Sequence, residues 1–137
     1  MEVLILFSMI FLHIVDDYYL QGILAKMKQK SWWIDNCKED YDFYKYDYLA
    51  ALFAHGFSWS FMITLPITVY SFYFKDFLNN SNYVYIWGLC VFLNAILHCF
   101  IDHLKANKKC INLIIDQTLH MFQIGTAFIL LFIMWRK

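Results

Sequence analysis

The amino-acid sequence predicts an all-α fold, a single domain over residues 1–137 in which four transmembrane helices form a bundle. The composition supports this prediction. Hydrophobic residues make up 61% of the chain and charged residues 16%, against about 45–50% and 25% in soluble domains. A soluble domain of 137 residues has too small an interior to bury so much apolar surface. The formal net charge is zero, so the chain has no basic excess for nucleic-acid binding.

Four apolar stretches are each long enough to span a bilayer, which takes about 20 helical residues. They run from about Val3 to Leu24, Tyr48 to Phe74, Tyr83 to Leu104 and Ile111 to Trp135. The first lacks the basic start and small-residue cleavage site of a signal peptide, so we expect an uncleaved helix. A charged, aromatic segment over residues 26–47 is expected to lie at the membrane interface between the first two helices. The short turn around residues 106–109 predicts an antiparallel hairpin of the last two helices.

The lysine and arginine residues predict the orientation, because cytoplasmic loops carry an excess of them. Eight flank one side of the predicted bundle: Lys26, Lys28, Lys30, Lys38, Lys45, Lys105, Lys108 and Lys109. Three flank the other side: Lys75, Arg136 and Lys137. We therefore expect both termini outside the cell and the first and third loops in the cytoplasm.

Ionisable and amide residues recur inside the apolar stretches at helical spacing. The groups, one on each predicted helix, are His13, Asp17 and Gln21; His55; His98, Asp102 and Lys105; and Asp116 and His120. Residues four apart lie on one stripe of a helix. The fourth helix reverses the His–Asp order of the third, and the two helices run in opposite directions, so like residues reach like depth. All four helices are thus expected to place these groups in one layer, in the cytoplasmic half of the membrane.

The cost of charge in a bilayer requires this layer to face inward. The three Asp residues would together cost on the order of 8–10 kcal/mol if they faced lipid, which rivals the net stability of a whole domain. Three compensations are open. A divalent metal, Zn²⁺, Mn²⁺ or Fe²⁺, could bind imidazole and carboxylate groups. Neutral His and protonated Asp could form a proton relay, or His–Asp and Lys–Asp pairs could join the helices structurally.

Each polar residue receives an expected role from this argument. The candidate metal ligands and the groups that orient them are His13, Asp17, His55, His98, Asp102, Asp116 and His120. Lys105 and Gln21 are candidate catalytic residues that would hold the anionic end of a substrate, Lys105 near Asp102. Asp16 is about 100° around the helix from Asp17 and is expected at the edge of the bundle. His103 is expected at the interface.

The order of these motifs along the chain resembles a small integral-membrane family of unknown function from bacteria and their phages. The motifs are H-x-x-x-D-x-x-x-Q, a lone H, H-x-x-x-D-x-x-K and D-Q-x-x-H. The matching residues are His13, Asp17 and Gln21; His55; His98, Asp102 and Lys105; and Asp116, Gln117 and His120. The resemblance implies a membrane fold in the cytoplasmic membrane of a bacterium or a phage-infected host, and no particular reaction. The H-x-x-x-D pattern is also similar to that of membrane-bound metal-dependent hydrolases, although the fourth helix inverts it.

These observations favour a membrane protein that binds one or two divalent metals and hydrolyses a phosphate- or ester-bearing molecule. The expected partners are the lipid bilayer and a lipid or anionic small molecule, without nucleic acid. Two alternatives stay open at this point. One is a proton or cation pathway through the same layer, and the other is a phage-coded membrane interaction protein whose His/Asp network is structural.

Overall fold

The computed structural model describes residues 1–74 and 81–136 and is all-α, as the sequence predicts. Its helices are α1 (Glu2–Val15), α2 (Leu24–Met27), α3 (Lys30–Asn36), α4 (Tyr41–Tyr44), α5 (Asp47–Phe74), α6 (Ser81–His103) and α7 (Leu113–Arg136). Two π-helical turns, η1 (Asp16–Leu20) and η3 (Leu104–Lys108), extend α1 and α6. Lys75 and Lys137, which the sequence analysis counted for orientation, lie outside the described residues.

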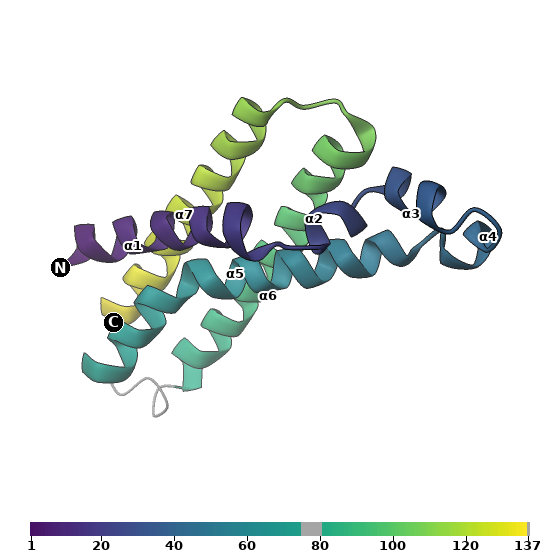
Figure 1. Cartoon of the computed structure of the whole chain (residues 1–137). Helices are drawn as coiled ribbons and strands as arrows, with labels where there is room; N and C mark the ends of the chain where they lie inside the picture. The colour runs from purple at the N-terminus through teal and green to yellow at the C-terminus, as the bar shows by residue number, and fades with distance from the viewer. Residues whose placement is uncertain (75–80, 137) are drawn as a thin grey trace.

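Four stretches of helix are long and apolar enough to cross a membrane. They are Glu2–Leu20, Tyr41–Phe74, Ser81–Lys108 and Leu113–Ile133. A helix suits this role because it satisfies its backbone hydrogen bonds internally, which lipid cannot do. Figure 1 shows both termini at one end of the bundle, with α3, α4 and η3 toward the other, and α6 and α7 running in opposite directions.

The apolar core occupies the half of the bundle nearer the termini. Met9, Ile63 and Leu131 from three different helices are fully buried there, and Ile67 and Ile124 pack with them. Large apolar side chains also cover the outside of the helices, among them Phe7, Phe11, Phe57, Phe100 and Phe122. An outer surface of this kind is expected for helices that face lipid.

Helices α5 and α6 approach most closely at Gly56. A Cβ atom at this position would lie 2.6 Å from the Cys99 Sγ and 2.9 Å from the Ala95 carbonyl oxygen. One turn further on, the Ser60 hydroxyl donates a hydrogen bond of 2.7 Å to the Val91 carbonyl. Small residues therefore set the spacing of these two helices, as is common in membrane proteins.

Between η1 and α5 the chain forms three short helices, of which α3 and α4 lie toward the end opposite the termini (Figure 1). Trp33, Tyr48 and Leu52 make a second small core there. Asn107 in η3 holds this segment against the bundle. Its side chain accepts a hydrogen bond of 2.7 Å from the Lys30 backbone and donates one of 2.9 Å to the Lys28 carbonyl.

The first span differs from the regular helix to Leu24 that the sequence predicts. The α-helix ends at Val15, a π-helical turn follows, and the chain turns at Gly22, whose φ is +51°. Glycine adopts this left-handed conformation without strain. The third span also ends in a π-helical turn, after which Lys109 takes a φ of 54°. Both π-helical turns lie beside the buried polar layer, and such turns are frequent at functional sites.

Candidate metal centre

The buried polar layer brings together the seven residues that the sequence singles out as candidate ligands. Together they come from all four spans: His13 and Asp17, His55, His98 and Asp102, and Asp116 and His120. The four histidines, Asp102 and Asp116 are at most 2% exposed. The Asp17 side chain is 7% exposed. The groups therefore share one centre that is shielded from lipid.

Asp17, His55 and His98 form a first set of candidate donors. One donor atom from each lies within 4.8 Å of the others. The His55 Nε2 atom is at the middle, 3.2 Å from Asp17 Oδ1 and 3.0 Å from His98 Nε2. Two imidazole nitrogens and a carboxylate oxygen that face one another so closely match the donor types that zinc and other divalent transition metals prefer.

His98, Asp102 and His120 form a second set, with one donor atom from each again within 4.8 Å of the others. His120 Nε2 is 3.7 Å from Asp102 Oδ1, and His98 Nε2 is 3.7 Å from Asp102 Oδ2. The His120 Nδ1 lies 3.1 Å from the Gln123 Oε1, which can only accept a hydrogen bond, so Nδ1 carries a proton. His98 belongs to both sets.

The separations between the donors lie close to those of a tetrahedral metal site. Ligand distances of about 2.0–2.2 Å imply donor–donor separations of roughly 3.3–3.6 Å. His55 Nε2 lies 3.2 Å from Asp17 Oδ1 and 3.5 Å from Asp102 Oδ2. The 3.0 Å contact of His55 with His98 and the 3.7 Å contacts of Asp102 are close to that range. Small side-chain movements would thus complete a site around a cation.

His13 and Asp116 lie in the layer but outside both candidate sets. His13 has both nitrogens engaged, because Nδ1 accepts a hydrogen bond of 2.7 Å from Trp59 and Nε2 lies 3.0 Å from the Gln117 Oε1. Asp116 Oδ1 is 3.5 Å from His120 Nε2 and has no hydrogen-bond partner in the described part of the chain. His13 and Asp116 therefore lie next to the candidate donors but do not belong to either donor set.

Asp16 corrects a sequence prediction. It was expected at the edge of the bundle, and the structure buries it to 1% exposure. Its Oδ1 accepts a hydrogen bond of 2.7 Å from Ser58, and its Oδ2 lies 3.6 Å from His55 Nδ1. The expectation rested on the angle between Asp16 and Asp17 alone, whereas Asp16 and Asp17 follow the buried His13 by three and four residues and so both lie on its side of the helix. Asp16 is placed to orient His55, as carboxylates do for metal-ligating histidines.

Trp59 is a central residue that the sequence analysis did not single out. It is fully buried, and its ring stacks on His98 with centroids 4.2 Å apart and an angle of 21°. Its indole N–H also fixes His13. The spacing of four residues from His55 was the available signal, because it places both side chains on one face of α5.

Two lysines neutralise part of the buried negative charge. Lys105 donates a 2.6 Å hydrogen bond to Asp116 Oδ2. Asp102 is paired with another lysine, Lys28, whose ammonium lies 2.6 Å from Asp102 Oδ2. The sequence analysis counted Lys28 only as a loop charge. No local spacing could relate it to Asp102, because the two are 74 residues apart.

The charge balance of the layer leaves room for one divalent cation. Asp16, Asp17, Asp102 and Asp116 face the two ammonium groups of Lys28 and Lys105 among the residues that the structure describes. With neutral histidines this leaves a formal excess of two negative charges. Uncompensated buried charge is costly, and a bound divalent ion would remove it.

Three further residues sit around the layer. Gln21 donates to Asp17 at 2.8 Å and lies 3.2 Å from His55 Nε2, so it caps the first donor set. Gln117 bridges the helices by donating to Asp17 at 3.2 Å and Asp116 at 3.0 Å. His103 is away from the donor sets and stacks on Tyr48.

Comparison of the chain with protein-family models, with curated proteins and with solved structures gives no match.

Proposed function

We propose that this chain is an integral membrane enzyme that holds a divalent metal ion in the buried layer and hydrolyses a phosphate- or ester-bearing molecule. The observation that carries the proposal is the pair of donor sets, each with two histidines and one aspartate, that share His98. Three protein ligands leave a coordination position open for water or substrate, as in catalytic metal sites. Zn²⁺, Mn²⁺ and Fe²⁺ all accept this donor set.

The chemistry supplied by such an ion is activation of water, whose pKa falls toward neutrality, and polarisation of the scissile group. In the hydrolysis, the water oxygen bonds to the phosphorus or carbonyl carbon, and the bond to the leaving oxygen breaks. Asp116 Oδ1 lies 3.5 Å from His120 Nε2, has no hydrogen-bond partner among the described residues, and would accept the proton of the water. The leaving oxygen would then take up this proton from Asp116. Gln21 and Lys105 hold the anionic end of the substrate in this proposal.

We place the protein in the cytoplasmic membrane of a bacterium or of a phage-infected host, with both termini outside and the metal centre in the cytoplasmic half. The excess of basic residues on the side of the short helices supports this orientation. The site would then face the headgroups and the cytoplasm, where phosphate- and ester-bearing molecules are available.

Metal analysis of the purified protein in detergent tests the proposal, with His98→Ala and His103→Ala as a matched pair on α6. Wild type and His103→Ala are expected to retain stoichiometric metal, because His103 lies outside the donor sets. His98→Ala is expected to lose it, since both sets lose a ligand. Circular dichroism confirms that each variant is folded, and His98→Gln replaces the Ala variant if the latter unfolds.

A folded His98 variant that keeps its metal would show that the donor sets are assigned wrongly. A wild-type protein without metal, destabilised equally by changes at any of the four buried histidines, would instead favour the structural network. The hydrolytic step is tested on the metal-loaded protein with p-nitrophenyl phosphate and p-nitrophenyl acetate. Turnover of either substrate that disappears in His120→Ala supports the proposal, and turnover of neither contradicts it.

A further inference from the structure

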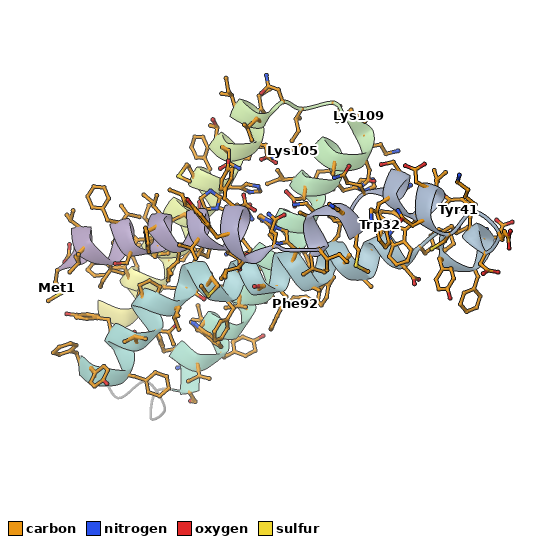
Figure 2. The ribbon with its side chains drawn as sticks, viewed as in Figure 1. Met1, Trp32, Tyr41, Phe92, Lys105 and Lys109 are labelled. Atoms are coloured by element: carbon orange, nitrogen blue, oxygen red, sulfur yellow. The ribbon has the colours of Figure 1, made fainter. Side chains whose placement is uncertain are left out.

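A cavity of about 400 Å³ opens beside the donor sets at the end of the bundle that carries η3. Its lining residues are Asp17, Tyr18, Gln21, Lys28, Gln29, Asp102, Lys105, Ala106, Lys109 and Gln117. Small-molecule sites in proteins have volumes of about 300–1,000 Å³, so the cavity is large enough for more than a single ion. Figure 2 shows Lys105 and Lys109 on this end of the molecule, away from Met1.

The lining of the cavity divides by charge. Asp17 and Asp102 belong to the donor sets and form the part of the wall toward the metal centre. Lys28, Lys105 and Lys109 supply three ammonium groups to the same cavity. Lysine is a common binder of phosphate, because it brings a full positive charge and several N–H donors. Three amide side chains, Gln21, Gln29 and Gln117, add neutral hydrogen-bonding groups to the lining.

The acidic and basic residues of the lining together make anion binding depend on the metal. Without a metal, the carboxylates of Asp17 and Asp102 repel an anion, and Lys28 is held by Asp102 at 2.6 Å. A divalent ion bound to Asp102 would neutralise the carboxylate that is now paired with Lys28. The Lys28 ammonium would then be available to an anion in the cavity, next to the metal.

The cavity also lies at the level where the membrane spans end. The first span ends at Leu20 and the third at Lys108, and the lining residues cluster around these two ends. Lipid headgroups begin at the ends of membrane-spanning helices, at the edge of the hydrocarbon core. A phosphate group can therefore reach the cavity either from a lipid headgroup or from solution.

We infer that this cavity binds the phosphate group of a phosphoester next to the metal, and that it does so only when the metal is present. The inference rests on the proposed function, because the metal must occupy the donor sets. It narrows the substrate from a phosphate- or ester-bearing molecule to a phosphoester. Lys109 makes no ion pair with the side chains that the structure describes, so its ammonium is the one fully available to the phosphate.

Equilibrium dialysis of the full chain in detergent against ³²P-labelled inorganic phosphate, with and without Mn²⁺, tests the inference. Lys109→Gln and Lys108→Gln are the matched variants, since both lysines are exposed and only Lys109 lines the cavity. Phosphate is expected to bind only with Mn²⁺. Binding should weaken about tenfold in Lys109→Gln, as for loss of one charge-assisted hydrogen bond, and stay unchanged in Lys108→Gln.

Competition separates the two sources of phosphate. Displacement of the label by phosphatidylcholine vesicles that contain phosphatidic acid, and not by glycerol 3-phosphate, assigns the site to a lipid headgroup. The reverse result assigns it to a soluble phosphoester, and both results support a phosphate site. Vesicles of phosphatidylcholine alone are the control for the added lipid.

The measured Mn²⁺ content distinguishes failure of this inference from failure of the proposed function. Stoichiometric Mn²⁺ without phosphate uptake would overturn the phosphate site and leave the metal centre standing. Equal phosphate uptake with and without Mn²⁺ would overturn the dependence of phosphate binding on the metal. An equal loss of phosphate binding in both lysine variants would overturn the role of Lys109. Absence of binding of Mn²⁺, Zn²⁺ and Fe²⁺ alike would overturn both proposals together.

Discussion

Among single residues, Asp16 is the one whose position most changes which side chains are assigned to the centre. Its carboxylate lies 3.6 Å from His55 Nδ1, while His55 Nε2 faces the donors of both neighbouring helices. A carboxylate in this position orients the imidazole and raises its basicity toward a metal. Asp16 thus belongs to the centre without being one of its ligands.

Replacing Asp16 tests this role. Asp16→Asn keeps the shape of the side chain and removes its charge, and we expect affinity for Zn²⁺ to fall about 10–100-fold. The measurement is competition with a chromophoric zinc chelator in detergent. Asp35→Asn, at an exposed position on α3, is the control and should leave the affinity unchanged. Equal affinity in wild type and Asp16→Asn would remove Asp16 from the metal centre.

The sequence could predict the residues of the layer that obey helical spacing. His13 with Asp17, His98 with Asp102, and Asp116 with His120 are each four residues apart, and an apolar helix makes such pairs conspicuous. The positions of Lys28 and Asp16 in the layer were not predicted, for two different physical reasons. Lys28 reaches Asp102 through tertiary folding across 74 residues. Asp16 was placed by its angle to Asp17 alone, although it follows the buried His13 by three residues and so lies on the same face of the helix.

At the scale of the elements, the close approach of α5 and α6 positions His55 against His98. Gly56 follows His55 directly, and a Cβ there would lie 2.9 Å from the backbone carbonyl of Ala95. A backbone atom in a packed helix cannot move aside as the end of a flexible side chain can. The absence of a side chain at residue 56 therefore keeps the two imidazoles within 3.0 Å.

Gly56→Ala is expected to destabilise the bundle by about 1–3 kcal/mol, the usual cost of overpacking a tight contact. Gly88→Ala in α6 is the matched control, because a Cβ at Gly88 would meet nothing within 4 Å. Thermal unfolding in detergent, followed by circular dichroism, should show a lower midpoint for the first variant and no decrease for the second. Equal midpoints for both variants would mean that α5 and α6 are not in tight contact at Gly56.

The spans themselves were predictable because the bilayer requires long apolar runs. The predicted second span of residues 48–74 matches Asp47–Phe74, and the predicted third span of residues 83–104 matches Ser81–His103 closely. The end of the first span was not predictable in the same way. Its hydropathy does not distinguish an α-helical from a π-helical turn, so the change at Asp16 left no signal in the apolar pattern.

At the scale of the whole molecule, the bundle divides along its length into an apolar half and a polar half. Met9, Ile63 and Leu131 fill the half nearer the termini, and the His/Asp layer fills the other. The apolar half joins the helices through contacts that involve no charged group. The polar half carries the buried carboxylates and the two candidate donor sets.

The orientation of this bundle in the membrane determines from which compartment a substrate reaches the site. Lys28 and Lys105 are engaged with buried carboxylates and so contribute less to the orientation signal than solvated lysines do. Six basic residues remain on that side against three on the other, an excess that still favours the proposed orientation, with the polar half toward the cytoplasm. Cys110 is exposed beside η3 and can serve as a labelling site for the polar end of the bundle. Position 2 can serve as a labelling site for the end that carries the termini.

Labelling of single-cysteine variants with a membrane-impermeant maleimide on bacterial spheroplasts tests the orientation. A variant that keeps only Cys110 should stay unlabelled until the membrane is permeabilised. Glu2→Cys in a background without the four native cysteines should be labelled at once, because the N-terminus faces outward. Immediate labelling of Cys110 with protection of position 2 would invert the orientation. The cavity would then open to the outer leaflet, and the phosphoester would have to come from outside the cell.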